Sequence, residues 1–189
     1  MTISPAQFAF AQRRIKAAGL DGQVTTKLCD YRDIGGQFDR IASIEMFEAV
    51  GERYWPVYFS HLHDRLVPGG RAALQIITIH DTLFEGYKRR PDFIQLHVFP
   101  GGMLPSETRL RQETDRAGLN WTAVRRFGRD YAQTLATWAQ LYRTNAAEIL
   151  SQGFDSRFDR LWRYYLAYCE AGFQTGRTDV IQLGLVKPA

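Results

Sequence analysis

The stretch that decides the fold is FDRIASIEMFEAVGERYWPVYFSHLHDRLVPGGRAALQIITI, residues 38–79. Its first part, Phe38–Met46, is short and mostly apolar, which is typical of a strand buried on both faces of a parallel sheet. Glu52–Val67 follows as a helix whose inner stripe consists of Trp55, Phe59, Leu62 and Leu66. Pro68–Gly70 ends this helix, and Arg71–Ile79 is a second buried strand. This order with short connections predicts a doubly wound α/β sheet.

The rest of the chain continues the alternation of helices and strands. A helix begins at Ser4 and Pro5, where serine is a favourable cap and proline is tolerated in the first turn. The stretch from His80 to Ser106 is less regular and ends in a loop rich in proline and glycine. The remaining predicted elements are a strand at Val24–Cys29, helices at Ser106–Gly118 and Tyr131–Ser151, a strand at Leu119–Phe127, a helix with apolar residues from Phe154 to Phe173, and a strand at Asp179–Val186.

Composition limits the classes of protein that this chain can represent. Its 189 residues are 45% apolar and 23% charged, which suits one packed domain and argues against wholesale disorder. The sequence contains no apolar run long enough to span a bilayer and no recognisable secretory signal. The two cysteines, Cys29 and Cys169, are read as free thiols of a cytoplasmic protein and not as metal ligands. The net charge of +4 permits an anionic partner, but no nucleic-acid-binding motif occurs.

Eight motifs, in order along the chain, resemble those of the cyclopropane-fatty-acyl-phospholipid synthases and mycolic acid cyclopropane synthases, which are S-adenosylmethionine-dependent methyltransferases. Three of them contain the specific stretches: SIEMFEAVG within FDRIASIEMFEAVG (38–51), FPGGMLPS (99–106), and DYAQTLATW within FGRDYAQTLATW (127–138). The others are TISPAQFAFAQRR (2–14), DYRD (30–33), LVPGG (66–70), LQIITI (74–79) and RYYLAYCEAGF (163–173). The resemblance implies an α/β fold, a Rossmann-like methyltransferase sheet with helices on both faces.

The resemblance covers the C-terminal part of a typical family member. A Gly-rich cofactor turn precedes the TISPAQ segment in the family, and no G-x-G-x-x-G sequence occurs in this chain. Residues 1–189 are therefore expected to form a truncated methyltransferase domain that lacks the first strand, turn and helix.

The resemblance also implies a set of contacts to S-adenosylmethionine. Thr2, Ile3 and Gln7 match the segment that lies over the cofactor ribose, although Thr2 and Gln7 could equally be part of ordinary helix capping. Tyr31 and Arg32 match the pair beside the adenine, with a solvated turn as the alternative. Ile44 matches an apolar contact and could equally be a core residue.

Glu48 and Tyr165 match the residues that hold a bicarbonate ion in the ring-forming members. There the acyl double bond attacks the sulfonium methyl, bicarbonate removes a proton from the transferred methyl, and the ring closes. Glu48 follows a predicted strand, at the edge where α/β sheets bind their ligands. The alternatives are a solvent-facing carboxylate for Glu48 and a core tyrosine for Tyr165.

Two residues depart from the pattern of the ring-forming members. Gln75 stands where they have a histidine, and glutamine cannot titrate. Glu45 stands where they have a glycine. The expected function is transfer of a methyl or methylene group to an unsaturated acyl chain of a phospholipid, forming a cyclopropane ring, with Gln75 as an imperfect third member of the site. The alternatives are methyl transfer without ring closure, on this or another acceptor, and an inactive remnant that binds a membrane or a partner.

A basic stretch suggests where such a protein could meet lipid. Six arginines and only two acids lie between Arg109 and Arg129. Each basic residue near an anionic bilayer contributes about 1 kcal/mol of attraction. The expected partners are phospholipid acyl chains at the membrane surface, which would make the protein peripheral to the inner face of the membrane. A solvated face of the fold is the other interpretation of this stretch.

Overall fold

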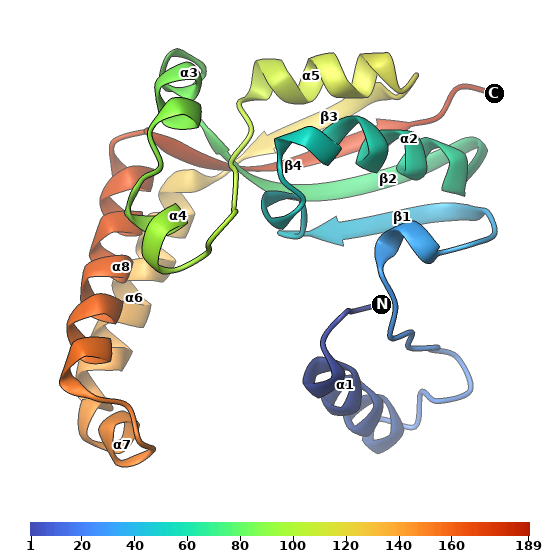
Figure 1. The fold of residues 1–189 in the computed structure, drawn as a ribbon. Helices are drawn as coiled ribbons and strands as arrows, with labels where there is room; N and C mark the ends of the chain where they lie inside the picture. Colours follow the sequence, from blue (N-terminus) through green and yellow to red (C-terminus); the bar gives the residue numbers. More distant parts are fainter. The chain divides into compact units, whose positions relative to one another are not determined.

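A computed structural model describes all residues, 1–189, as two compact units, Met1–Gln37 and Phe38–Ala189 (Figure 1). The first unit contains α1 (Pro5–Ala17) and a 3₁₀ helix (Tyr31–Asp33). The strands of the second unit are β1 (Phe38–Ile44), β2 (Leu66–Ile79), β3 (Asn120–Arg126) and β4 (Thr178–Val186). Its helices are α2 (Trp55–Arg65), α3 (Asp81–Arg89), α4 (Phe93–His97), α5 (Glu107–Arg116), α6 (Gly128–Thr144), α7 (Ala146–Ser151) and α8 (Ser156–Gln174), with 3₁₀ turns at Phe47–Ala49 and Glu52–Tyr54.

The first unit is held together by local capping and one isolated parallel bridge. Ser4 caps α1 by accepting a hydrogen bond from the Gln7 N–H, as its place before Pro5 predicts. The predicted strand at Val24–Cys29 is wrong, because only Leu28 pairs, in a bridge to Thr2. A single isolated bridge does not make a β-ladder, so this segment does not form a strand although its sequence is typical of one.

The second unit is built on a mixed four-stranded sheet of order β1-β2-β4-β3. β1 runs parallel to β2, whereas β4 is antiparallel to both β2 and β3. The predicted α/β, Rossmann-like class is correct. Burial of β1 on both faces is not observed: β1 is an edge strand with Phe38 and Ile44 exposed.

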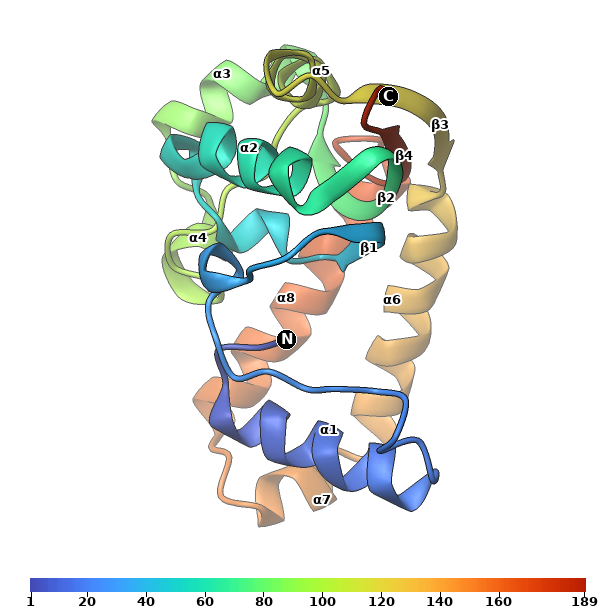
Figure 2. The same ribbon diagram turned by 90° about the vertical axis from the view of Figure 1, so that its right-hand side faces the viewer.

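The two faces of the sheet carry different helices (Figure 2). On one face, side chains of β2 and β4 pack with those of α2 and α5 into the main core. Its members include Trp55, Phe59, Leu62, Leu66, Leu74, Ile76, Leu110, Ile181, Leu183 and Leu185. The predicted α2 stripe is thus fully buried. On the other face, Ile77 and Val180 pack against the antiparallel pair α6 and α8. Gln75 and Gln182 lie on that second face as well, since side chains alternate along a strand.

Three boundaries differ from those expected. Pro68–Gly70 does not separate α2 from the next strand but lies within β2. The pairing of β1 with β2 is irregular at this point, so that Pro68–Gly70 have no partners in β1. The irregular stretch after His80 contains α3 and α4, which are capped by His80 and Asp92. These helices are too short to show a clear period. The predicted helix Tyr131–Ser151 breaks at Asn145, whose side-chain amide donates to the Leu141 carbonyl oxygen.

Candidate functional site

The carboxyl end of β1 brings several polar side chains together. β1 ends at Ile44 while β2 continues to Ile79, so the last N–H groups of β2 on this side have no strand to pair with. The chain turns immediately after β1 through Glu45, the only non-glycine residue with a positive φ, 48°. This turn and the following 3₁₀ helix aim Glu45 and Glu48 back toward the strand end.

Glu48 takes the place of the missing strand partner. Its Oε1 accepts a hydrogen bond from the Ile77 N–H at 2.5 Å, while its buried Oε2 has no hydrogen-bond partner. Burial raises the pKa of Glu48 to about 7, partly offset by backbone N–H donors and reinforced by the neighbouring Glu45. Glu48 is therefore not a solvated carboxylate at a helix start. It is a carboxyl group whose Oε2 has no hydrogen-bond partner and whose pKa lies near neutral pH, so it can take up or release a proton there.

Glu45 is held by two donors from different elements. Gln75 Nε2 donates to Glu45 Oε1 at 2.8 Å, and the Tyr131 hydroxyl lies 3.0 and 3.1 Å from its two carboxylate oxygens. Gln182 Nε2 in turn donates to Gln75 Oε1 at 3.1 Å, which orients the Gln75 amide. Burial first, and then Glu45, raise the pKa of Tyr131, so this hydroxyl remains a proton donor. A positive φ in a residue other than glycine costs about 1 kcal/mol or more, which makes the retained carboxylate a candidate for function.

Tyr165 joins this cluster from α8. Burial raises the pKa of Tyr165 to about 12, and the neighbouring Cys169 reinforces the shift. Glu45 contributes to the same shift, and Tyr165 contributes to that of Tyr131, which places the three groups within electrostatic reach. Burial raises the pKa of Cys169 to about 12 as well, so its thiol is a weak nucleophile. Of the three residues expected at the reaction site, Glu48 and Gln75 lie together at the end of β1, and Tyr165 lies within electrostatic reach of Glu45.

Sequence reasoning missed Tyr131 as a member of this cluster, although it lies within the specific segment FGRDYAQTLATW. It also treated Glu45 only as a departure from a family pattern. Ile44, the expected apolar contact, has 62% of its surface exposed at the carboxyl end of β1. An apolar surface in that position suits the ligand edge of an α/β sheet.

The remaining expected cofactor residues lie within the first unit. Thr2 Oγ1 donates to Gln7 Oε1 at 2.8 Å, and the Thr2 carbonyl oxygen accepts from the Cys29 N–H at 3.0 Å. This pairing brings the segment before α1 next to the segment that leads to Tyr31 and Arg32. The Arg32 guanidinium makes two hydrogen bonds to Asp30, at 2.9 and 2.8 Å, and lies over the Tyr31 ring. Ile3 is exposed.

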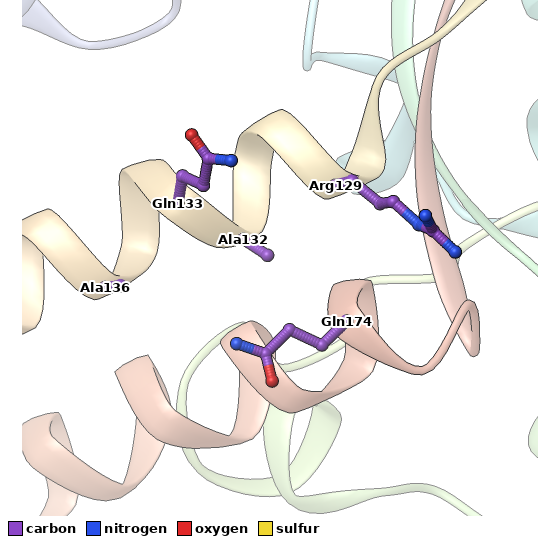
Figure 3. Close-up of a pocket in the computed structure, with 5 residues that line it drawn as sticks. All are labelled: Arg129, Ala132, Gln133, Ala136 and Gln174. Carbon is purple, nitrogen blue, oxygen red and sulfur yellow. The ribbon is translucent and has the colours of Figure 1, made fainter.

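A hollow of the surface lies apart from this cluster. One of about 280 Å³ lies in the groove between the start of α6 and the end of α8 (Figure 3). Arg129, Gln133 and Gln174 supply its polar atoms, and two alanines form its floor. Gln174 is already bonded to Glu170. None of the residues grouped around Glu45 lines this hollow.

The basic stretch from Arg109 to Arg129 is largely neutralised within the fold. Arg109 and Arg116 pair with the buried Glu113, and Arg111 and Arg126 pair with Glu107. Only Arg125 and Arg129 of the six form no ion pair. The interpretation as a solvated, internally paired face is thus favoured over a lipid patch. No helix of the chain combines the length and the apolar character that crossing a membrane requires.

Comparison with known proteins adds an independent finding. A family model described as "Mycolic acid cyclopropane synthetase" matches residues 1–183. The chain is 39% identical over 188 residues to tuberculostearic acid methyltransferase UfaA1 of Mycobacterium tuberculosis, covering 99% of this chain and 44% of that protein. It is 35% identical over 176 residues to cyclopropane-fatty-acyl-phospholipid synthase of Escherichia coli, covering 92% and 43%. The chain therefore spans less than half the length of these relatives.

Solved structures agree with the fold. Mycolic acid cyclopropane synthase CmaA1, complexed with SAH and CTAB, superimposes with a TM-score of 0.86 at 25% identity, over 98% of this chain and 68% of that one. Cyclopropane synthase MmaA2 from Mycobacterium tuberculosis gives a TM-score of 0.84 at 24% identity, with the same coverage of both chains.

Proposed function

Since the chain belongs to the mycolic acid cyclopropane synthetase family of S-adenosylmethionine-dependent methyltransferases, we propose that it methylates an unsaturated acyl chain of a phospholipid without closing a ring. One observation carries this proposal: Glu45 keeps a carboxylate at a positive φ, held by Gln75 and Tyr131. Ring-forming members, by the resemblance, have glycine and histidine at positions 45 and 75. The Glu45 carboxylate therefore occupies the region in which an external anion is expected.

The residues present do not fit bicarbonate. The Gln75 amide and the Tyr131 hydroxyl, which could donate to an anion, both donate to Glu45 instead. A second anion beside Glu45 and Glu48 would meet two carboxyl groups and no arginine or lysine paired with either. We therefore derive no step through bicarbonate, and we assign the proton transfer to the chain's own carboxylate.

The methyl donor in this proposal is a nucleoside, S-adenosylmethionine. The exposed, apolar Ile44 lies at the ligand edge of the second unit. In the first unit, Thr2, Ile3, Gln7, Tyr31 and Arg32 are the proposed contacts. When bound, S-adenosylmethionine supplies an electrophilic methyl group. The π electrons of the acyl double bond form the new C–C bond, and the electrons of the C–S bond leave with sulfur. A carbocation then remains on the acyl chain of the lipid.

Glu45 then takes a proton from a carbon next to the cation, and the C–H electron pair becomes a new double bond. The net change in the lipid is the addition of one CH₂, and the proton stays on Glu45 until it passes to water. Tyr131 and Gln75 fix the carboxylate through their hydrogen bonds. Positioned general bases contribute about a hundredfold to ten-thousandfold. Glu48, with a pKa raised to about 7, is mostly protonated and therefore uncharged near the cation below pH 7.

The product distinguishes this proposal from ring closure. Glu48 and Tyr165 stand at the positions expected in ring-forming members, so cyclopropane formation is the second candidate. We would supply vesicles of a monounsaturated phospholipid and a donor whose methyl carbon is ¹³C, and examine the acyl chains by NMR. We expect labelled branch carbon with olefinic protons, at a rate independent of added bicarbonate. High-field ring protons would support the second candidate, and absence of label from the lipid would contradict both.

A further inference from the structure

The capping box at the start of α4 has partners outside its own helix. Asp92 Oδ1 accepts from the Gln95 N–H at 3.1 Å, and Gln95 Oε1 accepts from the Asp92 N–H at 3.0 Å. These two bonds complete a capping box, which leaves Asp92 Oδ2 and Gln95 Nε2 for other contacts. The Tyr168 hydroxyl on α8 donates to Asp92 Oδ2 at 2.9 Å. Gln95 Nε2 donates to the Gly102 carbonyl oxygen at 3.0 Å. The box therefore links α8 to the loop that follows α4 (Figure 1).

A single peptide group connects this link to Glu48. The Gly102 carbonyl that Gln95 holds and the Met103 N–H belong to the same planar peptide unit. The Met103 N–H donates to the Glu48 carbonyl oxygen at 2.9 Å. The oxygen and the hydrogen of a trans peptide point in opposite directions, so a bond that fixes one also aims the other. Gln95 therefore sets the direction of the N–H group that holds the backbone of Glu48.

The loop 99–105 is conformationally permissive at this peptide. Gly101 has a φ of 83°, and a second glycine, Gly102, follows it directly. Glycines of this kind can adopt several backbone conformations at little cost. The Gly102 N–H donates to the Phe99 carbonyl oxygen at 2.9 Å, but this bond does not engage the peptide group that joins Gly102 to Met103. The side chain of Gln95 is thus a specific restraint on the orientation of that group.

Glu48 is held at two points, and one of them depends on this loop. Its carboxyl group accepts from the Ile77 N–H at 2.5 Å, and its carbonyl oxygen accepts from the Met103 N–H. The 3₁₀ helix that carries it, Phe47–Ala49, is one turn long and has no side-chain cap. A shift of this turn would expose the carboxyl group to water. Because burial is the main cause that raises the pKa of Glu48, that pKa reports the position of the turn.

We propose that Tyr168, Asp92 and Gln95 are positioning residues that hold Glu48 at the end of β1 through the peptide group between residues 102 and 103. We call these three residues the α4 clamp. The inference rests on the proposed function in treating Glu48 as part of the reaction site. A clamp that only stabilised α4 would affect the melting temperature of the chain and leave the carboxyl group of Glu48 where it is.

NMR titration of the Glu48 carboxyl carbon tests the proposal, in a chain labelled with ¹³C-glutamate. The Glu48→Gln variant identifies the resonance. Gln95→Met keeps the length of the side chain and removes both of its hydrogen bonds, and Tyr168→Phe removes one hydroxyl at the other end of the clamp. Gln133→Met and Tyr164→Phe are the matched controls, because both residues are exposed and their side chains form no hydrogen bond.

We expect the pKa of Glu48 to fall from about 7 toward 4.5 in each clamp variant, and to stay at about 7 in both controls. Tyr168→Phe and Gln95→Met interrupt the same chain of bonds, so the double variant should lower the pKa little more than Gln95→Met alone. A pKa in the clamp variants equal to that in the controls would overturn the proposal, whatever the melting temperatures. Fully additive shifts would overturn it too, because they would show that Tyr168 acts separately. If Gln95→Met does not fold, Tyr168→Phe decides the question alone.

Methyl transfer measured in parallel separates this inference from the proposed function. In an active chain, the clamp variants should lower kcat, by up to about a hundredfold. The KM for S-adenosylmethionine should not change, because the proposed contacts to it do not include the clamp residues. An unchanged kcat, with or without a higher KM, would overturn the claim that the clamp serves the reaction. If the parent chain transfers no label, the proposed function fails, while the titration still decides whether the clamp positions Glu48.

Discussion

The second unit contains two acidic regions, one buried and one half-buried, whose carboxyl groups have different partners. In α5, Glu113 is 1% exposed and each of its oxygens meets an arginine, Arg109 and Arg116, at 2.8 Å. At the carboxyl end of β1, Glu45 and Glu48 lie close enough to affect each other, and neither has an arginine or lysine partner. A buried charge that is fully paired is an ordinary structural feature, whereas a pair of unneutralised carboxyl groups persists only where the surrounding structure requires it.

The difference shows how local structure separates the two roles. Arg109 and Arg116 come from the same helix as Glu113, at i−4 and i+3, so the sequence itself supplies the neutralising charges. Glu45 and Glu48 receive only neutral donors, from β2 and α6, which fix the carboxyl groups without supplying a positive charge. Such an arrangement can hold or remove a proton next to a developing cation.

The largest effect on stability is expected from Glu113→Ala. The substitution leaves two arginines without their buried partner, and loss of one member of such a network costs about 3 kcal/mol, since Arg116 can return to water. Chemical denaturation measures this loss, with Glu148→Ala on the exposed face of α7 as the control. A cost below about 1 kcal/mol would contradict the view that Glu113 is a structural charge.

A smaller effect, opposite in sign, is expected from Glu48→Gln. The pKa of Glu48 is raised from 4.5 to about 7, so the folded chain keeps a proton between these values that the unfolded chain loses. Stability contributed by the neutral form is present below pH 4.5 and is lost as the pH rises through 7. Above pH 7 the buried charge costs at most about 3 kcal/mol. Glutamine cannot ionise and can still accept from the Ile77 N–H.

Melting temperatures measured from pH 4 to pH 8 test this prediction. The Glu48→Gln variant should match the parent chain at pH 4 and exceed it at pH 8. A difference in melting temperature that stays constant across this range, or a variant less stable than the parent chain at pH 8, would contradict the prediction. Either result would show that the fold stabilises the charged form of Glu48, as it does that of Glu113.

The amphipathic and apolar patterns predicted much of the fold, because they reflect burial directly. The α2 stripe and the strands at Arg71–Ile79 and Asp179–Val186 are cases in which local pattern and packing agree. The strand at Val24–Cys29 failed because a strand needs partners, which its own residues cannot reveal. The break at Asn145 depends on one side-chain hydrogen bond that competes with the helix.

The candidate site was predictable only in part. Glu48, Gln75 and Tyr165 could be matched to motifs; Glu48 and Gln75 lie together at the end of β1, and Tyr165 is within electrostatic reach of Glu45. Whether Thr2, Gln7, Tyr31 and Arg32 contact a cofactor stays a prediction. Tyr131 could not be found by spacing, because its contact with Glu45 joins residues 86 positions apart. The positive φ of Glu45 is likewise invisible in the sequence, although the family's glycine at that position was a signal for it.

The most direct test of the account is methyl transfer by Glu45→Gly in the absence and presence of formate. Glycine adopts the positive φ of residue 45 without strain and leaves room for a small carboxylate between Gln75 and Tyr131. With labelled donor and unsaturated phospholipid, we expect the variant to lose about a hundredfold or more in rate and formate to restore part of it. Glu45→Gln, which fills the same space without a base, should be slow and unresponsive to formate. Full activity of Glu45→Gln would contradict the claim that the Glu45 carboxylate removes the proton.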